Sequence, residues 1–339
     1  MNEAPQRKRV NLALQGGGAH GAFTWGVLDA FLDDGRLDVV ALSGTSAGAM
    51  NAVAFADGLR EGGLAGAREQ LERFWRGASV DGGCNETQRR AIELAFGFWD
   101  PFKVRESWAS ALANFASPYD LNPLDINPLR EVVGREIDFQ AVRESDGPKL
   151  FIAATNVYTG KVRIFRRPEL TLDMLMASAC LPTVFQAVEI DGIPYWDGGY
   201  MGNPVLFPFF TESDSEDVIL VQINPIERRE TPHSVRDILS RLDEITFNAP
   251  LLQEFRAIDF VARLIEAGRL DGTHYKQIRM HLVASEELQK FGARSKMDAD
   301  YDFFRELFAI GRDAGAQFLK QNFETIGSRA TLDLKEQLI

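Results

Sequence analysis

The pattern of hydrophobic and polar positions changes period several times near the start of the chain. Residues 10–14 alternate between apolar and polar or small side chains, which predicts a strand, and a glycine-rich stretch follows at residues 16–21. Apolar residues then recur at helical spacing over 23–32. A short β-branched run at 39–42 predicts a second, buried strand, and the alanine-rich residues 47–59 predict a helix. The chain therefore opens β-α-β-α, which is typical of a parallel sheet covered by helices.

The remaining sequence predicts further strands and helices. Strands are expected at 150–156 and 161–165, as a hairpin around a Tyr-Thr-Gly turn, at 217–223, and more weakly at 278–284. Helices are expected over most of 235–268 and 301–323, with three helical segments between 64 and 118. A proline-rich loop is expected at 117–128. The fold class predicted is α/β with a mainly parallel central sheet and a helical C-terminal part.

Composition excludes several classes of protein. The chain has 339 residues, 45% of them hydrophobic and 25% charged, as in a soluble globular protein of one large or two ordinary domains. A formal net charge of -12 argues against a nucleic-acid partner. Two cysteines, Cys84 and Cys180, provide neither a disulfide framework nor a zinc cluster. With no apolar signal segment or membrane-length run, we expect a cytoplasmic protein, with peripheral membrane contact left open.

The turn after the second strand has the spacing G-x-S-x-G, from Gly44 through Ser46 to Gly48. Such glycines permit a tight strand-to-helix turn, from which the serine hydroxyl projects at the helix N-terminus. A serine in this position can be a nucleophile or simply the N-cap of the helix. The turn alone favours neither interpretation.

The glycine stretch at residues 16–21, GGGAHG, also satisfies G-x-G-x-x-G between a strand and a helix. A dinucleotide site needs an acidic residue at the end of the second strand, but Asp38 lies at the beginning of that strand. No Gly-Lys-Ser/Thr follows to make a phosphate-binding P-loop. Backbone amides at a helix N-terminus can instead bind the oxyanion of an ester's tetrahedral intermediate. Two parallel strands would bring this loop and Ser46 to the same edge of the sheet.

A serine nucleophile needs a neighbouring base, and the sequence offers two kinds. One is Asp197, which precedes Gly198 and Gly199 in a third glycine motif. The other is a histidine downstream, as in the order Ser-Asp-His of α/β-hydrolases; the candidates are His233, His274 and His281. None of these histidines lies in a glycine-marked turn, and burial can raise the pKa of a carboxyl group enough for it to act as the base. We therefore predict Asp197 as the base.

Together these stretches resemble the patatin-like phospholipase family. Residues 16–21 are similar to the family's oxyanion loop, 44–48 to its nucleophile elbow and 197–199 to its D-G-G/A motif. Residues 177–182 resemble the segment that usually precedes the aspartate. The resemblance covers about residues 9 to 210.

The resemblance implies a three-layer α/β/α fold with a catalytic domain over residues 9–210. The rest of the chain lies outside the resemblance, and we expect residues 211–339 to form a C-terminal strand-and-helix extension packed on the same domain. The resemblance also implies a Ser46–Asp197 dyad and neither metal nor cofactor. The residues implied for the oxyanion hole are Gly16, Gly17, Gly18 and Ala19. Those implied to support the motifs are Gly44, Gly48, Gly198, Gly199 and His20. The family usually has arginine or lysine where this chain has His20, so stabilisation of the oxyanion would rest on backbone amides.

The activity implied is hydrolysis of acyl esters in phospholipids or lysophospholipids. An acyltransferase or thioesterase could use the same dyad, and an inactive binding or scaffold protein is the alternative from another class. The partners expected are a lipid or other acyl ester and, transiently, a membrane surface; the sequence does not determine the oligomeric state.

An aromatic-rich stretch at 94–119 includes Trp99, Phe102 and Trp108. This stretch could be a lid or interfacial surface that leads lipid to the serine, or a helical pair packed on the core, which is the commoner use of such spacing.

Overall fold

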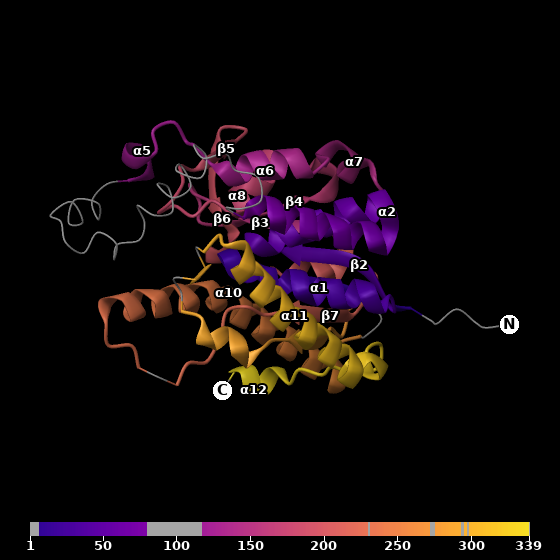
Figure 1. Ribbon diagram of the computed structural model, residues 1–339. Helices are drawn as coiled ribbons and strands as arrows, with labels where there is room; N and C mark the ends of the chain where they lie inside the picture. Colours follow the sequence, from indigo (N-terminus) through magenta and orange to yellow (C-terminus); the bar gives the residue numbers. More distant parts are fainter. Residues whose placement is uncertain are drawn as a thin grey trace.

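An eight-stranded sheet runs through the molecule (Figure 1). The computed structural model describes residues 7–79, 117–229, 231–271, 275–292, 295–296 and 298–338. The strands are β1 (Lys8–Leu14), β2 (Leu37–Gly44), β3 (Lys149–Asn156), β4 (Val162–Arg166), β5 (Val188–Ile190), β6 (Ile193–Asp197), β7 (Asp217–Val221) and β8 (Arg279–Val283). Their order is β5-β6-β3-β2-β1-β7-β8, with β4 also paired to β3.

The central strands β3, β2, β1, β7 and β8 are parallel to one another, whereas β4 and β6 pair antiparallel with β3, and β5 pairs antiparallel with β6. Loops that follow the parallel strands therefore meet at one edge of the sheet, the carboxyl edge. The mainly parallel sheet predicted from the sequence is confirmed.

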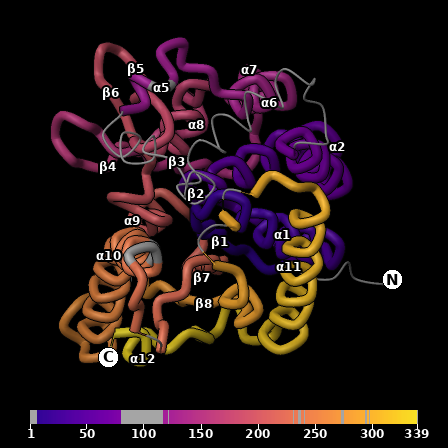
Figure 2. Tube along the Cα trace, turned by 60° about the vertical axis from the view of Figure 1, so that its left-hand side comes forward, coloured from indigo at the N-terminus to yellow at the C-terminus, as the bar shows by residue number. Residues whose placement is uncertain are grey.

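Helices cover both faces of the sheet, which makes the three-layer α/β/α arrangement (Figures 1 and 2). The helices are α1 (Gly21–Asp34), α2 (Ala47–Ala78), α5 (Pro118–Leu121), α6 (Pro128–Glu136), α7 (Phe139–Glu144), α8 (Leu172–Ser178), α9 (Phe207–Glu212), α10 (Val235–Glu266), α11 (Tyr301–Asn322) and α12 (Leu334–Leu338). Short 3-10 helices are η1 (Gly18–His20), η2 (Arg167–Glu169), η3 (Gly198–Tyr200), η4 (Glu286–Lys290) and η6 (Phe323–Thr325). Helices α1, α2 and α11 lie on one side, and α9 and α10 on the other (Figure 2).

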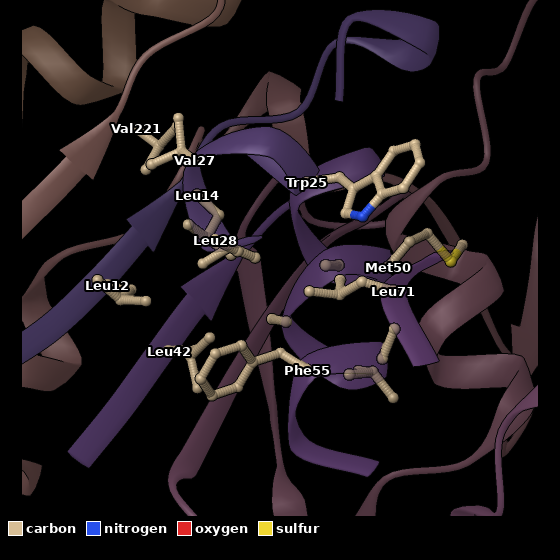
Figure 3. Packing of buried hydrophobic residues seen from close by; sticks show 14 of the residues in the cluster. Leu12, Leu14, Trp25, Val27, Leu28, Leu42, Met50, Phe55, Leu71 and Val221 are labelled. Atoms are coloured by element: carbon tan, nitrogen blue, oxygen red, sulfur yellow. The ribbon is translucent and has the colours of Figure 1, made fainter. Parts of the chain in front are cut away.

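Each face of the sheet buries its own apolar cluster, because side chains alternate between faces along a strand. Leu12, Leu14 and Leu42 point toward α1 and α2, where they pack with Leu28 and Phe55 (Figure 3). The opposite face packs against α9 and α10; members of its cluster include Ala13, Ala41, Ala153, Phe209, Leu251 and Phe255. The two clusters hold the parallel strands rigidly, so the loops at the carboxyl edge start from fixed positions.

Most elements expected from the sequence are present. The hairpin at 150–165 is confirmed as the antiparallel pair β3–β4. The helix expected over 47–59 continues to Ala78 across a kink where Gly62 and Gly63 leave the helical conformation. The short strands β5 and β6, on either side of the Asp191-Gly192 turn, were not predicted, because three to five half-buried residues give too short a pattern.

The C-terminal residues contribute directly to the sheet, since β7 pairs with β1 and β8 pairs with β7. The division into 9–210 and 211–339 stays a prediction. Most of the aromatic-rich stretch, with Trp99, Phe102 and Trp108, lies outside the described residues, as does Cys84. None of the helices in the described part of the chain combines the length and apolar character needed to cross a bilayer.

Candidate active site

The glycine loop and the serine turn lie side by side at the carboxyl edge. Strand β1 leads into residues 16–18, and β2, its parallel neighbour, leads into Ser46. A Cβ atom on Gly16 would lie 2.8 Å from the Cβ atom of Ser46, and one on Gly48 would lie 2.1 Å from the carbonyl oxygen of Leu14. Both contacts are too close for any side chain. Glycine at these positions therefore allows the two turns to approach each other.

Ser46 has a strained backbone, with φ 54° and ψ −123°. It occupies the N-cap position of α2, yet its side chain accepts no capping hydrogen bond from that helix. Ser46 is partly exposed, whereas Thr45 and Ala47 are buried. The interpretation of Ser46 as a simple cap therefore loses its physical basis. The geometry is that of a serine whose hydroxyl is held away from its own helix.

Asp197 reaches the same edge from the opposite direction. Strand β6 is antiparallel to β3, so it runs back into the sheet and ends at Asp197, which pairs with Ala154. Gly44, at the end of β2, pairs with Ile152. Asp197 therefore lies two residues farther toward the carboxyl edge than Gly44. Ser46 also follows Gly44 by two residues. The antiparallel hairpin that the sequence pattern missed is the element that brings the carboxylate to the serine.

The carboxyl group of Asp197 is fully buried. Its Oδ1 accepts a hydrogen bond of 2.7 Å from the amide of Gly199, while Oδ2 has no partner of good geometry among the described residues. Burial raises the pKa of Asp197 to about 7, against the opposing effects of the Gly199 amide and of the nearby Ser46 hydroxyl, which lower it. A carboxyl group with a pKa near neutrality can exchange protons at physiological pH.

Ser178 and Cys180, at the C-terminal end of α8, connect the two candidate catalytic residues. The buried hydroxyl of Ser178 accepts a hydrogen bond of 3.0 Å from the amide of Ser46. The carbonyl oxygen of Cys180 accepts one of 2.8 Å from the amide of Asp197. Both residues lie in the 177–182 segment singled out in the sequence. This segment therefore forms hydrogen bonds with both Ser46 and Asp197.

A network of buried amide side chains holds the glycine loop. Asn203 Oδ1 accepts the amide of Gly16 at 2.6 Å, and Asn224 Nδ2 donates to the carbonyl oxygen of Gly16 at 2.7 Å. Gln15 joins these two residues, because its Nε2 donates to the Asn203 carbonyl and its Oε1 accepts from the Asn224 amide. The sequence analysis missed all three. Asn203 comes a few residues after the D-G-G motif, but Asn224 follows β7 far along the chain.

The amides of Gly17 and Gly18 meet no acceptor among the described residues. They lie at the start of η1, just before α1, where backbone N–H groups point out of the helix end. Such amides can bind a negatively charged oxygen. The end of β2 carries no carboxylate for a ribose, since it is Ser43-Gly44, so the loop lacks the partner that a dinucleotide site requires.

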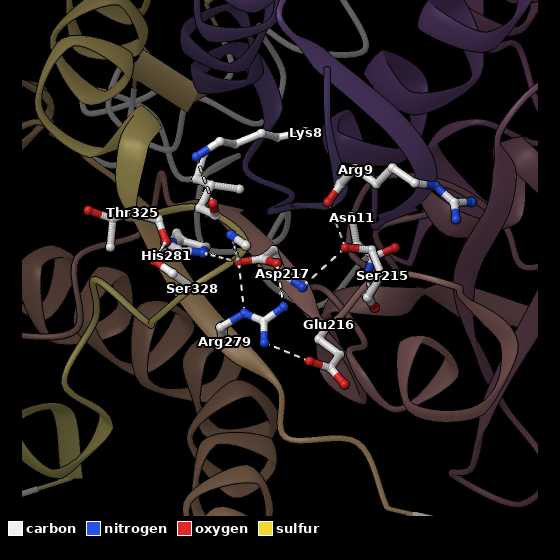
Figure 4. A network of polar contacts seen from close by, with 12 residues as sticks. Lys8, Arg9, Asn11, Ser215, Glu216, Asp217, Arg279, His281, Thr325 and Ser328 are labelled. Carbon is white, nitrogen blue, oxygen red and sulfur yellow. Dashed lines mark hydrogen bonds and ion pairs between the residues drawn. The ribbon is translucent and has the colours of Figure 1, made fainter. Parts of the chain in front are cut away.

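The histidines lie elsewhere or are occupied. His281 is buried in β8, where its Nε2 bonds Asp217 at 3.0 Å and its Nδ1 bonds Thr331 at 2.9 Å. Asp217, which bonds His281 in Figure 4, begins β7 and therefore lies at the amino edge of the sheet, opposite the carboxyl edge at which Ser46 follows β2. His233 is exposed and precedes α10, and His274 lies outside the described residues. His281 is therefore not placed to take a proton from Ser46, and no hydrogen bond joins His233 to Ser46 among the described residues.

Within the described ranges, no group of three His, Cys, Asp or Glu side chains could hold a metal ion. A hollow of about 540 Å³ lies between α1, α2 and α11, away from Ser46, and Trp25, Asp29 and Arg68 are among its lining residues. Arg68 already pairs with Asp29. Neither Ser46 nor Asp197 nor the glycine loop lines the hollow, so it is not part of the site at the carboxyl edge.

The chain matches the patatin-like phospholipase family over residues 12–210, more than half of its length. The chain belongs to the patatin-like phospholipase family. Membership of this family supports an activity on lipid acyl esters. No curated protein matches the chain in sequence.

Two solved structures are similar to this chain. One is VipD from Legionella pneumophila, with 16% sequence identity and a TM-score of 0.39, over 94% of this chain and 67% of VipD. The other is human GIVD cytosolic phospholipase A2, solved in complex with methyl gamma-linolenyl fluorophosphonate. It has 13% identity and a TM-score of 0.40, over 98% of this chain and 59% of that one.

Proposed function

We propose that this protein hydrolyses acyl esters of phospholipids or lysophospholipids through a Ser46–Asp197 dyad. The observation that carries the proposal is the pairing of a strained, uncapped serine with a fully buried carboxyl group whose pKa is raised to about 7. A serine hydroxyl needs a base, and this carboxyl group is the ionisable group that the sheet register brings level with it.

In the acylation step, the Ser46 oxygen attacks the ester carbonyl carbon while Asp197 accepts the hydroxyl proton. The carbonyl oxygen becomes an oxyanion, which the amides of Gly17, Gly18 and Ala19 bind. Collapse of the tetrahedral intermediate breaks the ester C–O bond. The proton held by Asp197 passes to the leaving alcohol oxygen, and the acyl group stays on Ser46.

In the deacylation step, Asp197 takes a proton from water as the water attacks the acyl-serine carbonyl. The same amides bind the second oxyanion, and the proton returns to the Ser46 oxygen as the fatty acid leaves. Each step needs Asp197 first as a base and then as an acid. A pKa near 7 serves both roles, because neither protonation state is strongly disfavoured at neutral pH.

Apolar side chains beside the dyad support a lipid substrate. Phe247 of α10 lies against Gly199, where an added Cβ would be 2.2 Å from its ring. Tyr200 packs edge-on against Phe247 with ring centroids 5.3 Å apart, and Met201 next to it is 41% exposed. These residues would offer an acyl chain an apolar surface next to Asp197.

The test is covalent labelling with a fluorophosphonate, followed by assays on a short-chain nitrophenyl ester and on a panel of phospholipids and lysophospholipids. Wild type should be labelled and active, and Ser46→Ala should lose both properties while melting at the same temperature. Ser328→Ala, which changes an exposed serine far from the site, is the matched control and should match wild type. Labelling that persists in Ser46→Ala would remove Ser46 as the nucleophile.

A further inference from the structure

The segment around Lys296, in the C-terminal region beyond the family match, lies directly on the glycine loop. A Cβ atom on Gly18 would be 2.2 Å from the carbonyl oxygen of Lys296, and Gly18 has φ +59°. Ser295 Oγ lies 2.7 Å from His20 Nε2. Two neighbouring residues of this segment thus contact the loop, and a side chain at position 18 would prevent their approach.

The hydrogen bonds define the state of His20. Ser295 donates its single hydroxyl proton to the Gly292 carbonyl at 2.8 Å, so toward His20 it can only accept. Nε2 of His20 must therefore carry a proton and donate it. Burial, and to a smaller degree the charge of Lys296, lowers the pKa of His20 to about 3. His20 is neutral at physiological pH and adds no positive charge to the loop.

Among the described residues, Lys296 brings a cationic side chain to the loop. Its Nζ donates to Asn224 Oδ1 at 2.7 Å, and Asn224 in turn donates to the carbonyl oxygen of Gly16 at 2.7 Å. Burial of the ammonium end lowers the pKa of Lys296, while the carboxylates of Glu244 and Asp243 raise it and Arg228 lowers it. The residue as a whole is only partly covered.

We propose that Lys296 is a positioning residue of the ester-hydrolysing site, which acts through Asn224 on the carbonyl of Gly16 and places positive charge behind the oxyanion loop. Polarisation by the ammonium group strengthens the Asn224–Gly16 hydrogen bond, because linked hydrogen bonds reinforce one another in a low-dielectric setting. The charge also favours the oxyanion electrostatically. This inference rests on the proposed function, since it assigns a role within the same reaction.

The first experiment compares Lys296→Met, which keeps the length but removes the charge, with Lys296→Arg, which keeps both charge and donor. On a soluble nitrophenyl ester, kcat of Lys296→Met should fall about 10- to 100-fold, less than the roughly 100- to 1000-fold loss for a donor that touches an oxyanion directly. KM should stay within about twofold, and Lys296→Arg should recover most of kcat. The matched control is Lys290→Met, which removes an exposed lysine from the neighbouring η4 and should leave kcat unchanged.

A second readout separates an electrostatic role from a merely structural one. As pH rises, the kcat of the wild type should decline when Lys296 loses its proton, at a pH below the usual range of lysine pKa values. This decline should be absent in Lys296→Arg. The groups that face Lys296 are Asp243 and Glu244 from α10, Arg228 after β7, and neutral His20. The same alkaline decline in wild type and Lys296→Arg would overturn the proposal.

A double-mutant cycle tests the route through Asn224. If Lys296 acts through Asn224, the fold-loss of kcat in the double variant should be clearly smaller than the product of the fold-losses in Lys296→Met and Asn224→Ala. Fully multiplicative losses, or an unchanged kcat in folded Lys296→Met, would overturn the inference and leave the dyad intact. A wild-type protein that neither hydrolyses esters nor reacts with a fluorophosphonate would instead overturn the proposed function, and this inference with it.

Discussion

The two edges of the central sheet each bury an aspartate, and the two carboxyl groups behave in opposite ways. Asp197, at the carboxyl edge, is 0% exposed and Asp217, at the amino edge, is 2% exposed. Burial raises the pKa of Asp197 to about 7, because only the Gly199 amide and the Ser46 hydroxyl oppose it. Burial also acts on Asp217, but His281, Arg279 and the Gly327 amide outweigh it and hold the pKa of Asp217 well below its usual range.

The comparison shows that burial alone does not identify a reactive carboxylate. Asp217 has partners on both oxygens, including a double hydrogen bond from Arg279 (Figure 4). It connects β7, β8 and the turn at Gly327, and so its role is structural. Asp197 keeps one oxygen without a good partner among the described residues, beside the serine. An unpaired buried oxygen costs stability, and such a cost is typical of functional sites.

The largest effect should come from removing the ionisable group at the carboxyl edge. Asp197→Asn should lower kcat by about 10³- to 10⁵-fold, because the amide cannot accept the Ser46 proton. Steady-state turnover of a nitrophenyl ester measures this loss. If the folded Asp197→Asn enzyme kept kcat within tenfold of wild type, Asp197 would not be the base.

The same substitution should increase stability at alkaline pH. The pKa of Asp197 is raised in the folded state, so the stability that the neutral carboxyl confers is complete below about pH 4 and is lost as pH rises through about 7. At about 1.4 kcal/mol per pKa unit, the three-unit rise corresponds to up to about 4 kcal/mol. Urea unfolding at pH 8 should show Asp197→Asn to be more stable than wild type, and a less stable variant would contradict the account.

The amino edge should respond in the reverse manner. Asp217→Asn should cost about 3–5 kcal/mol of unfolding free energy, because it leaves the charge of Arg279 without its buried partner. Turnover per folded molecule should stay within a few-fold of wild type. Asp214→Asn, which alters an exposed ion pair with Arg9, is the control and should cost less than about 1 kcal/mol.

Activity, which depends on Asp197, and stability, which depends on Asp217, should change over different pH ranges. Activity should fall about tenfold per pH unit as pH drops below about 7, because Asp197 becomes protonated and can no longer act as a base. The pKa of Asp217 is lowered in the folded state, so its stabilisation is present above about pH 4 and is lost only as pH falls further. Thermal melts between pH 5 and 8 should therefore show a folded protein throughout the loss of activity.

The smallest effects should come from the histidines. His281→Gln should cost about 1–3 kcal/mol, since Asp217 and Thr331 lose a buried partner, and should leave kcat nearly unchanged. His233→Ala, at an exposed position, should change neither quantity. A loss of kcat in either folded variant as large as that of Asp197→Asn would restore the Ser-Asp-His alternative.

Local patterns in the sequence were sufficient to predict the parallel sheet, the two glycine turns and the candidate pair Ser46 and Asp197. Strand and helix periods, and the short spacing of G-x-S-x-G, depend on neighbouring residues and can be read along the chain. The resemblance to the patatin-like phospholipase family rested on the same motifs, and the family match over residues 12–210 confirms it.

Contacts between distant segments could be found only in the tertiary structure. The β5–β6 hairpin, which carries Asp197 back to the serine, depends on pairing with β3 rather than on its own short pattern. Asn224 and Lys296 reach the glycine loop from more than 200 residues away in the chain. The D-G-G motif singled out Asp197, but the pKa of a carboxyl group depends on burial and on partners from several elements, so only the tertiary structure shows that the pKa is raised for Asp197 and lowered for Asp217.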